Sequence, residues 1–185
     1  MTDHDQERFT YVLVDGENID ATLGNSILGR RPRPEERPRW DRLLEWAEQQ
    51  MQQEVKGLFF LAVNEEMPLT FIQALTAIGF RPVPLRGEGK IVDIAIQRTA
   101  EALAQRNADV VLASHDGDFM PQIRQLCDGT RQVALVGFTE FMNSGFRGLP
   151  GLRTFDLEND VRAFNTSLPR IKVIDIDSFD PFDFL

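Results

Sequence analysis

Short apolar runs alternate along the chain with stretches in which apolar residues recur at helical spacing. Runs of this length predict strands that are buried on both faces, as in a parallel sheet. The predicted strands are residues 9–14, 58–63, 80–85, 110–113 and 133–136, with a shorter sixth at 153–155. The predicted helices are residues 40–51, 69–78, 91–106, 118–127 and 157–165. This alternation predicts an α/β fold in which a mainly parallel sheet of five to six strands carries helices on both faces.

Three local features refine this organisation. Pro82 and Pro84 remove two hydrogen-bond donors from the third strand, which is therefore expected at an edge of the sheet. Residues 24–39 are rich in Gly, Arg and Pro, and we expect a basic loop inserted into the domain. Residues 170–185 carry four Asp and three Phe with little helical periodicity. We therefore expect one domain over residues 1–169 and an acidic, aromatic tail over residues 170–185.

Composition excludes several classes of protein. The 185 residues suit one domain, and a hydrophobic content of 42% with 26% charged residues is typical of a globular chain. The longest apolar runs have six residues, whereas a membrane-spanning helix needs about 20. The N-terminus is acidic and polar, unlike a signal peptide. The single cysteine, Cys127, excludes an internal disulfide framework and a cysteine-cluster zinc site. We expect a cytoplasmic protein with no membrane association.

The net charge of −9 also bears on function. A chain this acidic has no general attraction to long duplex DNA, because such binding depends on neutralising many phosphates. A nucleic-acid enzyme with a local basic patch remains compatible with this charge. So does a protein that gathers carboxylates around a metal ion, because the ion offsets part of the negative charge.

Four aspartates fall where the predicted strands end. Asp15 follows the first strand, Asp116 and Asp118 follow the fourth, and Asp93 lies in the first turn of the helix after the third. In open α/β sheets, ligands bind beyond the carboxyl ends of the strands, near the point where the strand order reverses. If the first and fourth strands are neighbours, all four carboxylates converge. Crowded like charges repel one another, and a divalent cation removes that conflict.

Oxygen-only ligands suit Mg²⁺ or Mn²⁺ better than zinc or copper. One or two such ions can bind a phosphodiester, activate water and stabilise the leaving oxygen. Each aspartate alone also has a structural interpretation, since Asp15 suits a turn, Asp93 suits a helix dipole, and Asp116 with Asp118 suits a turn and an N-cap. The combination favours a metal site. His115, beside the cluster, is either a proton donor or a residue that lines the pocket.

At these residues the chain resembles the NYN domain, a branch of the PIN-like nuclease superfamily, and especially its LabA-like bacterial members. The resemblance rests on three motifs over roughly residues 9–160. They are Val14-Asp15-Gly16-Glu17-Asn18, Lys90-Ile91-Val92-Asp93, and Ser114-His115-Asp116-Gly117-Asp118-Phe119 with Pro121 soon after. Ile91 and His115 depart from the pattern, because a glycine and a small residue respectively are usual at these places.

The resemblance implies a PIN-like Rossmannoid three-layer sandwich with strand order 3-2-1-4-5. It also implies metal-dependent cleavage of RNA, which makes the chain a candidate endoribonuclease using Mg²⁺ or Mn²⁺. Asn18 and Ser114 would support the site. The implied metal ligands and catalytic residues are Asp15, Asp93, Asp116 and Asp118.

Two functions remain open. In the first, the chain hydrolyses RNA, with Arg86 and Lys90 binding substrate near the metal and the arginines of residues 24–39 supplying a further phosphate contact. That loop is equally typical of a solvated linker. In the second, the domain is a regulatory or RNA-binding module with weak or no catalysis, acting through its loop or tail. Tail residues such as Ile171, Val173 and Ile174 are expected to add a strand to the domain or to a second copy, or to contact a protein partner, unless the terminus is disordered.

Overall fold

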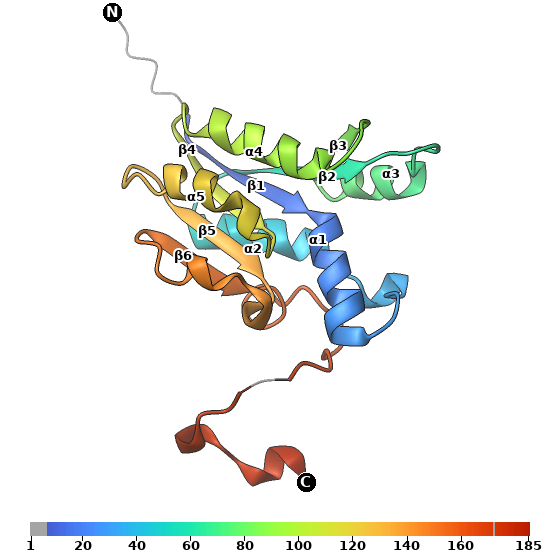
Figure 1. The fold of residues 1–185 in the computed structure, drawn as a ribbon, viewed down its shortest axis with the longest axis vertical. Helices are drawn as coiled ribbons and strands as arrows, with labels where there is room; N and C mark the ends of the chain where they lie inside the picture. Colours follow the sequence, from blue (N-terminus) through green and yellow to red (C-terminus); the bar gives the residue numbers. More distant parts are fainter. Residues whose placement is uncertain (1–6, 172) are drawn as a thin grey trace, which may run out of the picture.

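The computed structural model describes residues 7–171 and 173–185. Its centre is one sheet of six parallel strands in the order β3-β2-β1-β4-β5-β6 (Figure 1). The strands are β1 (Phe9–Asp15), β2 (Val55–Ala62), β3 (Phe80–Leu85), β4 (Ala108–Ala113), β5 (Val133–Gly137) and β6 (Leu152–Asp156). All six predicted strands and the predicted order are confirmed, and the sixth strand extends the sheet beside β5.

Helices cover both faces of this sheet, as predicted. They are α1 (Gly16–Ala21), α2 (Trp40–Met51), α3 (Leu69–Ala77), α4 (Ile91–Leu103) and α5 (Met120–Leu126). Along β1, Val12 and Val14 pack with α1, α2 and α3, whereas Leu13 between them packs with α4 and α5. Successive side chains of a strand point to opposite faces, so a continuous apolar run supplies both hydrophobic clusters. The result is a three-layer α/β sandwich.

The strand order places the ends of β1 and β4 side by side. These strands pair in parallel with Val14 opposite Ala113, so Asp15 and Ser114 leave the sheet at the same level. At the far edge, β3 pairs with β2 and with no other strand of the described residues. Pro82 and Pro84 therefore lie in an edge strand, where a missing backbone donor is tolerated.

The segment expected to be a loop from residue 24 is partly helical. Helix α1 continues into a π-helical stretch, Thr22–Leu28, that ends at Gly29 in a left-handed conformation (φ 68°). Further along, Pro34–Glu36 forms a 3-10 turn. The loop prediction was wrong for residues 24–28, because the glycine and arginine content masked a continuation of the helix.

The helix predicted at residues 157–165 is not formed. The side chain of Asp156 accepts hydrogen bonds from the backbone N–H groups of Glu158 and Asn159 at 2.9 and 2.8 Å. Asp160 Oδ2 in turn accepts from the N–H of Asp156, and Arg162 has a positive φ of 58°. These short-range side-chain bonds to the backbone stabilise turns in place of a helix.

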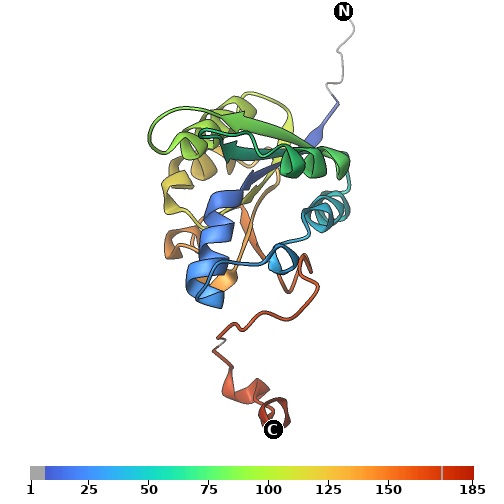
Figure 2. The same ribbon diagram turned by 90° about the vertical axis from the view of Figure 1, so that its right-hand side faces the viewer.

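The tail leaves the domain after a buried arginine. The Arg170 side chain is only 2% exposed, and it forms ion pairs with Glu140, Asp156 and Glu158. Beyond it, the described residues contain two 3-10 turns, Ile176–Ser178 and Pro181–Phe184, and no strand. The tail extends away from the sheet in both views (Figures 1 and 2). The expected additional strand on its own domain is therefore absent from the part of the tail that the structure describes.

Within residues 7–171 and 173–185, no helix combines the length and the apolar character needed to cross a bilayer.

Candidate metal centre

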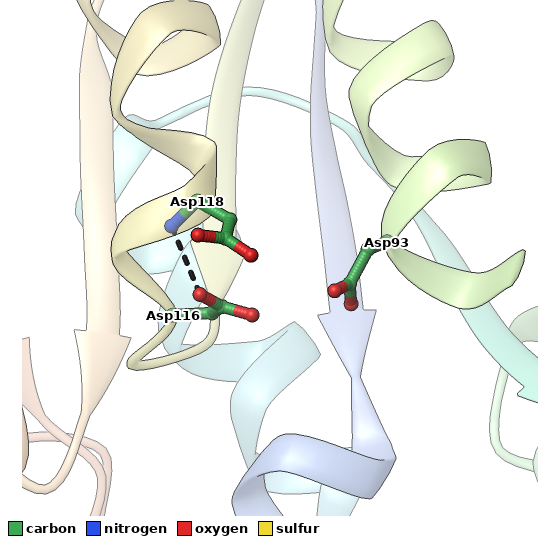
Figure 3. Close-up of side chains that lie close together, drawn as sticks. All are labelled: Asp93, Asp116 and Asp118. Carbon is green, nitrogen blue, oxygen red and sulfur yellow. Dashed lines mark hydrogen bonds between the residues drawn. The ribbon is translucent and has the colours of Figure 1, made fainter. Parts of the chain in front are cut away.

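Three carboxylates meet beyond the carboxyl ends of the central strands. Asp116 and Asp118 follow β4, and Asp93 faces them from the first turn of α4 (Figure 3). One oxygen atom from each of the three side chains lies within 4.8 Å of the others. Three of the four aspartates implied by the sequence motifs thus form one compact group.

Local hydrogen bonds fix the two aspartates that follow β4. Asp116 Oδ1 accepts a bond from the backbone N–H of Asp118 at 2.9 Å and so caps the 3-10 turn that begins at Gly117. The N–H of Asp116 donates to the Ser114 hydroxyl at 3.1 Å. Asp116 therefore has the capping role that the sequence allowed for it, and this role holds its carboxylate beside that of Asp118.

Asp15 lies in the same cleft but outside the group of three. It is 2% exposed, and its oxygens accept from the Ser114 hydroxyl at 3.0 Å and from the backbone N–H of Asn18 at 3.4 Å. Burial raises the pKa of Asp15 to about 6, against the effect of these two hydrogen bonds, and the charges of Asp93 and Asp116 raise it further. A carboxylate in this position is costly to ionise unless a cation is nearby.

The cleft has a volume of about 320 Å³, and Lys90 is the cationic side chain among the described residues that line it. Lys90 Nζ lies 3.0 Å from Asp118 and 3.9 Å from Asp93, and the hydrogen bond to Asp118 raises the pKa of the lysine. The pKa of Asp93 is also raised, by burial and then by the charge of Asp116. The Lys90 ammonium lies among carboxylate oxygens, where a cation would bind. These carboxylate oxygens are ligands that suit Mg²⁺ or Mn²⁺.

A family model for the NYN domain matches residues 9–147, three-quarters of the chain and all four aspartates. The chain belongs to the NYN domain family. This family is nuclease-related, so the acidic cleft lies in a nuclease-like fold. The match ends before β6, so the last strand and the tail lie outside the shared region.

The fold also matches a solved structure. A protein of unknown function from Vibrio parahaemolyticus, VPA0982, superposes with a TM-score of 0.65 over 86% of this chain and 98% of its own. The two sequences are 17% identical, so the likeness concerns the fold. No curated protein matches the sequence significantly.

The supporting residues expected from the motifs are only partly brought together in this NYN domain. Asn18 and Lys90 line the cleft, and Ser114 is fully buried beneath it, bonded to Asp15. Arg86 is exposed and lies outside the set of residues that line the cleft. Arg86 was expected near the metal site, but it does not line the cleft.

Sequence reasoning missed two cleft neighbours. Glu17 lines the cleft, and its side chain accepts from the backbone N–H of Ala62 at 3.4 Å. Gln97 donates to the backbone carbonyl of Asp118 at 3.3 Å. Each carries a weak signal in the sequence, since Glu17 lies within the first motif and Gln97 is one helical turn after Asp93.

His115 is buried and neutral. It is 7% exposed, and burial lowers its pKa to about 4. Its ring stacks on Phe138, with centroids 5.5 Å apart and planes 16° from parallel. A proton donor must be accessible to the substrate, and this buried ring is not. Of the two roles open in the sequence, the structure favours a residue packed behind the pocket.

Proposed function

We propose that this NYN domain is a metal-dependent ribonuclease of the PIN-like superfamily, in its LabA-like branch. Its substrate is RNA, its reaction is hydrolysis of the phosphodiester bond, and its cofactor is Mg²⁺ or Mn²⁺. The observation that carries the proposal is the group of Asp93, Asp116 and Asp118 at the carboxyl end of a nuclease-related sheet, with buried Asp15 beside it.

The residues of the cleft would have different roles in this reaction. Asp93, Asp116 and Asp118 would hold the ion, and Asp15 would complete the acidic site from the end of β1. When bound, the ion supplies a positive charge that orients the phosphodiester, activates a water molecule and stabilises the leaving oxygen. Lys90, displaced from Asp118, is long enough and exposed enough to contact a phosphate oxygen instead.

The direct test is incubation of the purified protein with a mixed RNA pool and manganese, beside the Asp116→Asn variant. Metal-dependent shortening of RNA by the wild type alone supports the proposal. Intact RNA with both proteins, under conditions in which manganese binds, favours the regulatory alternative.

The basic segment offers only part of its charge to RNA. Arg30 is paired with Glu36 at 2.5 Å and Arg37 with Asp20 at 2.8 Å, so these arginines are partly neutralised by their own domain. Arg31 and Arg33 are exposed on the same segment. If the segment binds RNA, these two side chains are the ones best placed to contact phosphates.

Replacing Arg31 and Arg33 by Ala is therefore expected to weaken RNA binding and flatten its salt dependence. Each lost phosphate contact reduces the slope of log K against log salt by roughly 0.7 for a single strand. Fluorescence anisotropy over a salt series measures this slope. The matched control is Arg106→Ala with Arg124→Ala, which removes equal charge from exposed positions elsewhere. Equal slopes for the two double variants would indicate that residues 29–39 are a solvated linker that does not contact RNA.

The tail favours a second candidate function, a protein-interaction module. Its described residues expose large apolar side chains to an unusual degree, with Ile171 at 91%, Ile176 at 81% and Phe182 at 81%. Asp175 and Asp180 cap its two turns, and the Phe179 and Phe184 rings lie 5.7 Å apart. An exposed aromatic peptide of this kind suits docking into an apolar groove of a second copy or of another protein.

Deleting residues 171–185 while keeping Arg170 is expected to leave the melting temperature within about 2 °C of the full chain, because the tail buries little against its own domain. Calorimetry measures this. Light scattering in parallel reports whether the tail links two copies, in which case the truncated protein has the lower mass. A large fall in melting temperature at unchanged mass would show that the tail packs on its own domain in solution.

A further inference from the structure

The side-chain carbonyl of Asn18 is held by two N–H groups of His115 and, at 3.2 Å, by the Ser114 hydroxyl. Asn18 Oδ1 lies 2.7 Å from the backbone nitrogen of His115 and 3.0 Å from its ring Nδ1. Asn18 also lines the acidic cleft with Asp15, Asp93 and Asp116. What this amide presents to the cleft therefore depends on how His115 and Ser114 hold its carbonyl oxygen.

The hydrogen bonds of the histidine define its tautomer. The backbone N–H of Phe138 donates to His115 Nε2 at 2.7 Å, so Nε2 bears the lone pair and the proton of the neutral ring lies on Nδ1. Nδ1–H then donates to Asn18 Oδ1, with the Thr22 hydroxyl oxygen at 3.2 Å as a second acceptor. The ring packs closely against Gly137, where a Cβ would lie 2.6 Å from Nε2.

These hydrogen bonds fix the orientation of the Asn18 amide. A carbonyl oxygen accepts about two good hydrogen bonds. The backbone and ring N–H groups of His115 make the two shortest contacts to Asn18 Oδ1, and the Ser114 hydroxyl, which also lies 3.0 Å from Asp15, is a third contact at 3.2 Å. The NH₂ group occupies the opposite branch of the amide, directed away from His115. We propose that His115 is a positioning residue that makes Asn18 a hydrogen-bond donor to an anionic phosphate oxygen of the RNA, and not an oxygen ligand of the cation.

The inference rests on the proposed function and sharpens it. The cleft is rich in acceptors, since Asp15, Asp93 and Asp116 line it and all bear carboxylate oxygens. A phosphodiester entering it needs donors, and Lys90 is the other donor side chain among the lining residues. An amide that turned its carbonyl inward would add one more acceptor facing an anion.

Isosteric variants separate the two roles of Asn18. Asn18→Asp keeps oxygen acceptors for both N–H groups of His115 and replaces the donor by an anionic oxygen. Gly89→Asp is the matched charge control, because Gly89 lines the same cleft and a Cβ there meets nothing within 4 Å. Its positive φ of 77° strains any side chain, and Asp is one of the residues for which this strain is smallest. His115→Asn keeps a donor near the Nδ1 position, whereas His115→Gln keeps an acceptor near Nε2 and loses that donor.

The measurements are manganese affinity by calorimetry and affinity for a short single-stranded RNA in calcium buffer by anisotropy, with the RNA checked for cleavage. We expect Asn18→Asp to bind manganese at least as tightly as the wild type and RNA about tenfold more weakly than Gly89→Asp does. We expect His115→Gln to lose a few-fold in RNA affinity and His115→Asn to retain it. The ¹⁵N shifts of the His115 ring should show Nδ1 protonated and Nε2 bare.

Three results would overturn the inference: equal RNA affinities of Asn18→Asp and Gly89→Asp, loss of manganese binding in Asn18→Asp, or a proton on Nε2. Failure of the proposed function looks different. In that case the wild type binds manganese no better than Asp116→Asn does, whatever the ring nitrogens and the RNA affinities show.

Discussion

Asp116→Asn is expected to abolish the manganese-induced rise in melting temperature and to lower RNA cleavage by about a thousandfold. A ligand of the folded state stabilises it by mass action, so a lost site removes the shift. The rate loss reflects several kcal/mol of transition-state stabilisation that the bound ion supplies. The fold should survive, because Asn retains an oxygen to accept the bond from the N–H of Asp118.

The measurements are a thermal melt with increasing manganese and a gel assay of RNA cleavage. Glu48→Gln is the matched control, since it removes one carboxylate charge from an exposed position on α2. It should keep both the shift and the cleavage. A shift of wild-type size in Asp116→Asn would place the ion away from this cleft.

The strand pattern predicted the strands and the parallel α/β class, and the family resemblance supplied the strand order. The short apolar runs around Val12 and Val111 are flanked by turns, and burial on both faces of the sheet accounts for them. Pro82 and Pro84 gave the edge position of β3 without any structural information. Once β1 and β4 are neighbours, the register that sets Val14 opposite Ala113 brings the carboxylates that follow them together.

The remaining features depend on contacts that a pattern does not contain. The turn after β6 forms because Asp156 bonds to backbone groups two and three residues on, and this competes with a helix of the same composition. The orientation of Asn18 depends on His115, ninety-seven residues away in sequence. The position of Lys90 between Asp118 and Asp93 likewise depends on how α4 packs against the turn after β4.

Asp15→Asn is expected to stabilise the metal-free protein at neutral pH by about 3 kcal/mol. The pKa of Asp15 is raised from 3.8 to about 6 on folding, mainly by burial, and each unit corresponds to about 1.4 kcal/mol. A raised carboxyl pKa means that the folded state prefers the protonated form. Relative to Asn, the wild type therefore loses stability as pH rises from about 4 to about 6, and the deficit stays constant above that.

Calorimetry in EDTA between pH 4 and pH 8 measures this difference. The variant should melt roughly 6–10 °C above the wild type at pH 8, and the two curves should meet near pH 4. His115, whose pKa is lowered to about 4, acts in the opposite sense, because its buried neutral form loses stability as pH falls below about 6.5. Both proteins carry this histidine, so its effect cancels in the comparison.

A constant gap at every pH would show that the two side chains differ in packing and that the Asp15 carboxylate is not destabilised by its burial. Saturating manganese should then reverse the order at pH 8, because the ion offsets the buried charge of the wild type and leaves the neutral variant without one of its proposed ligands.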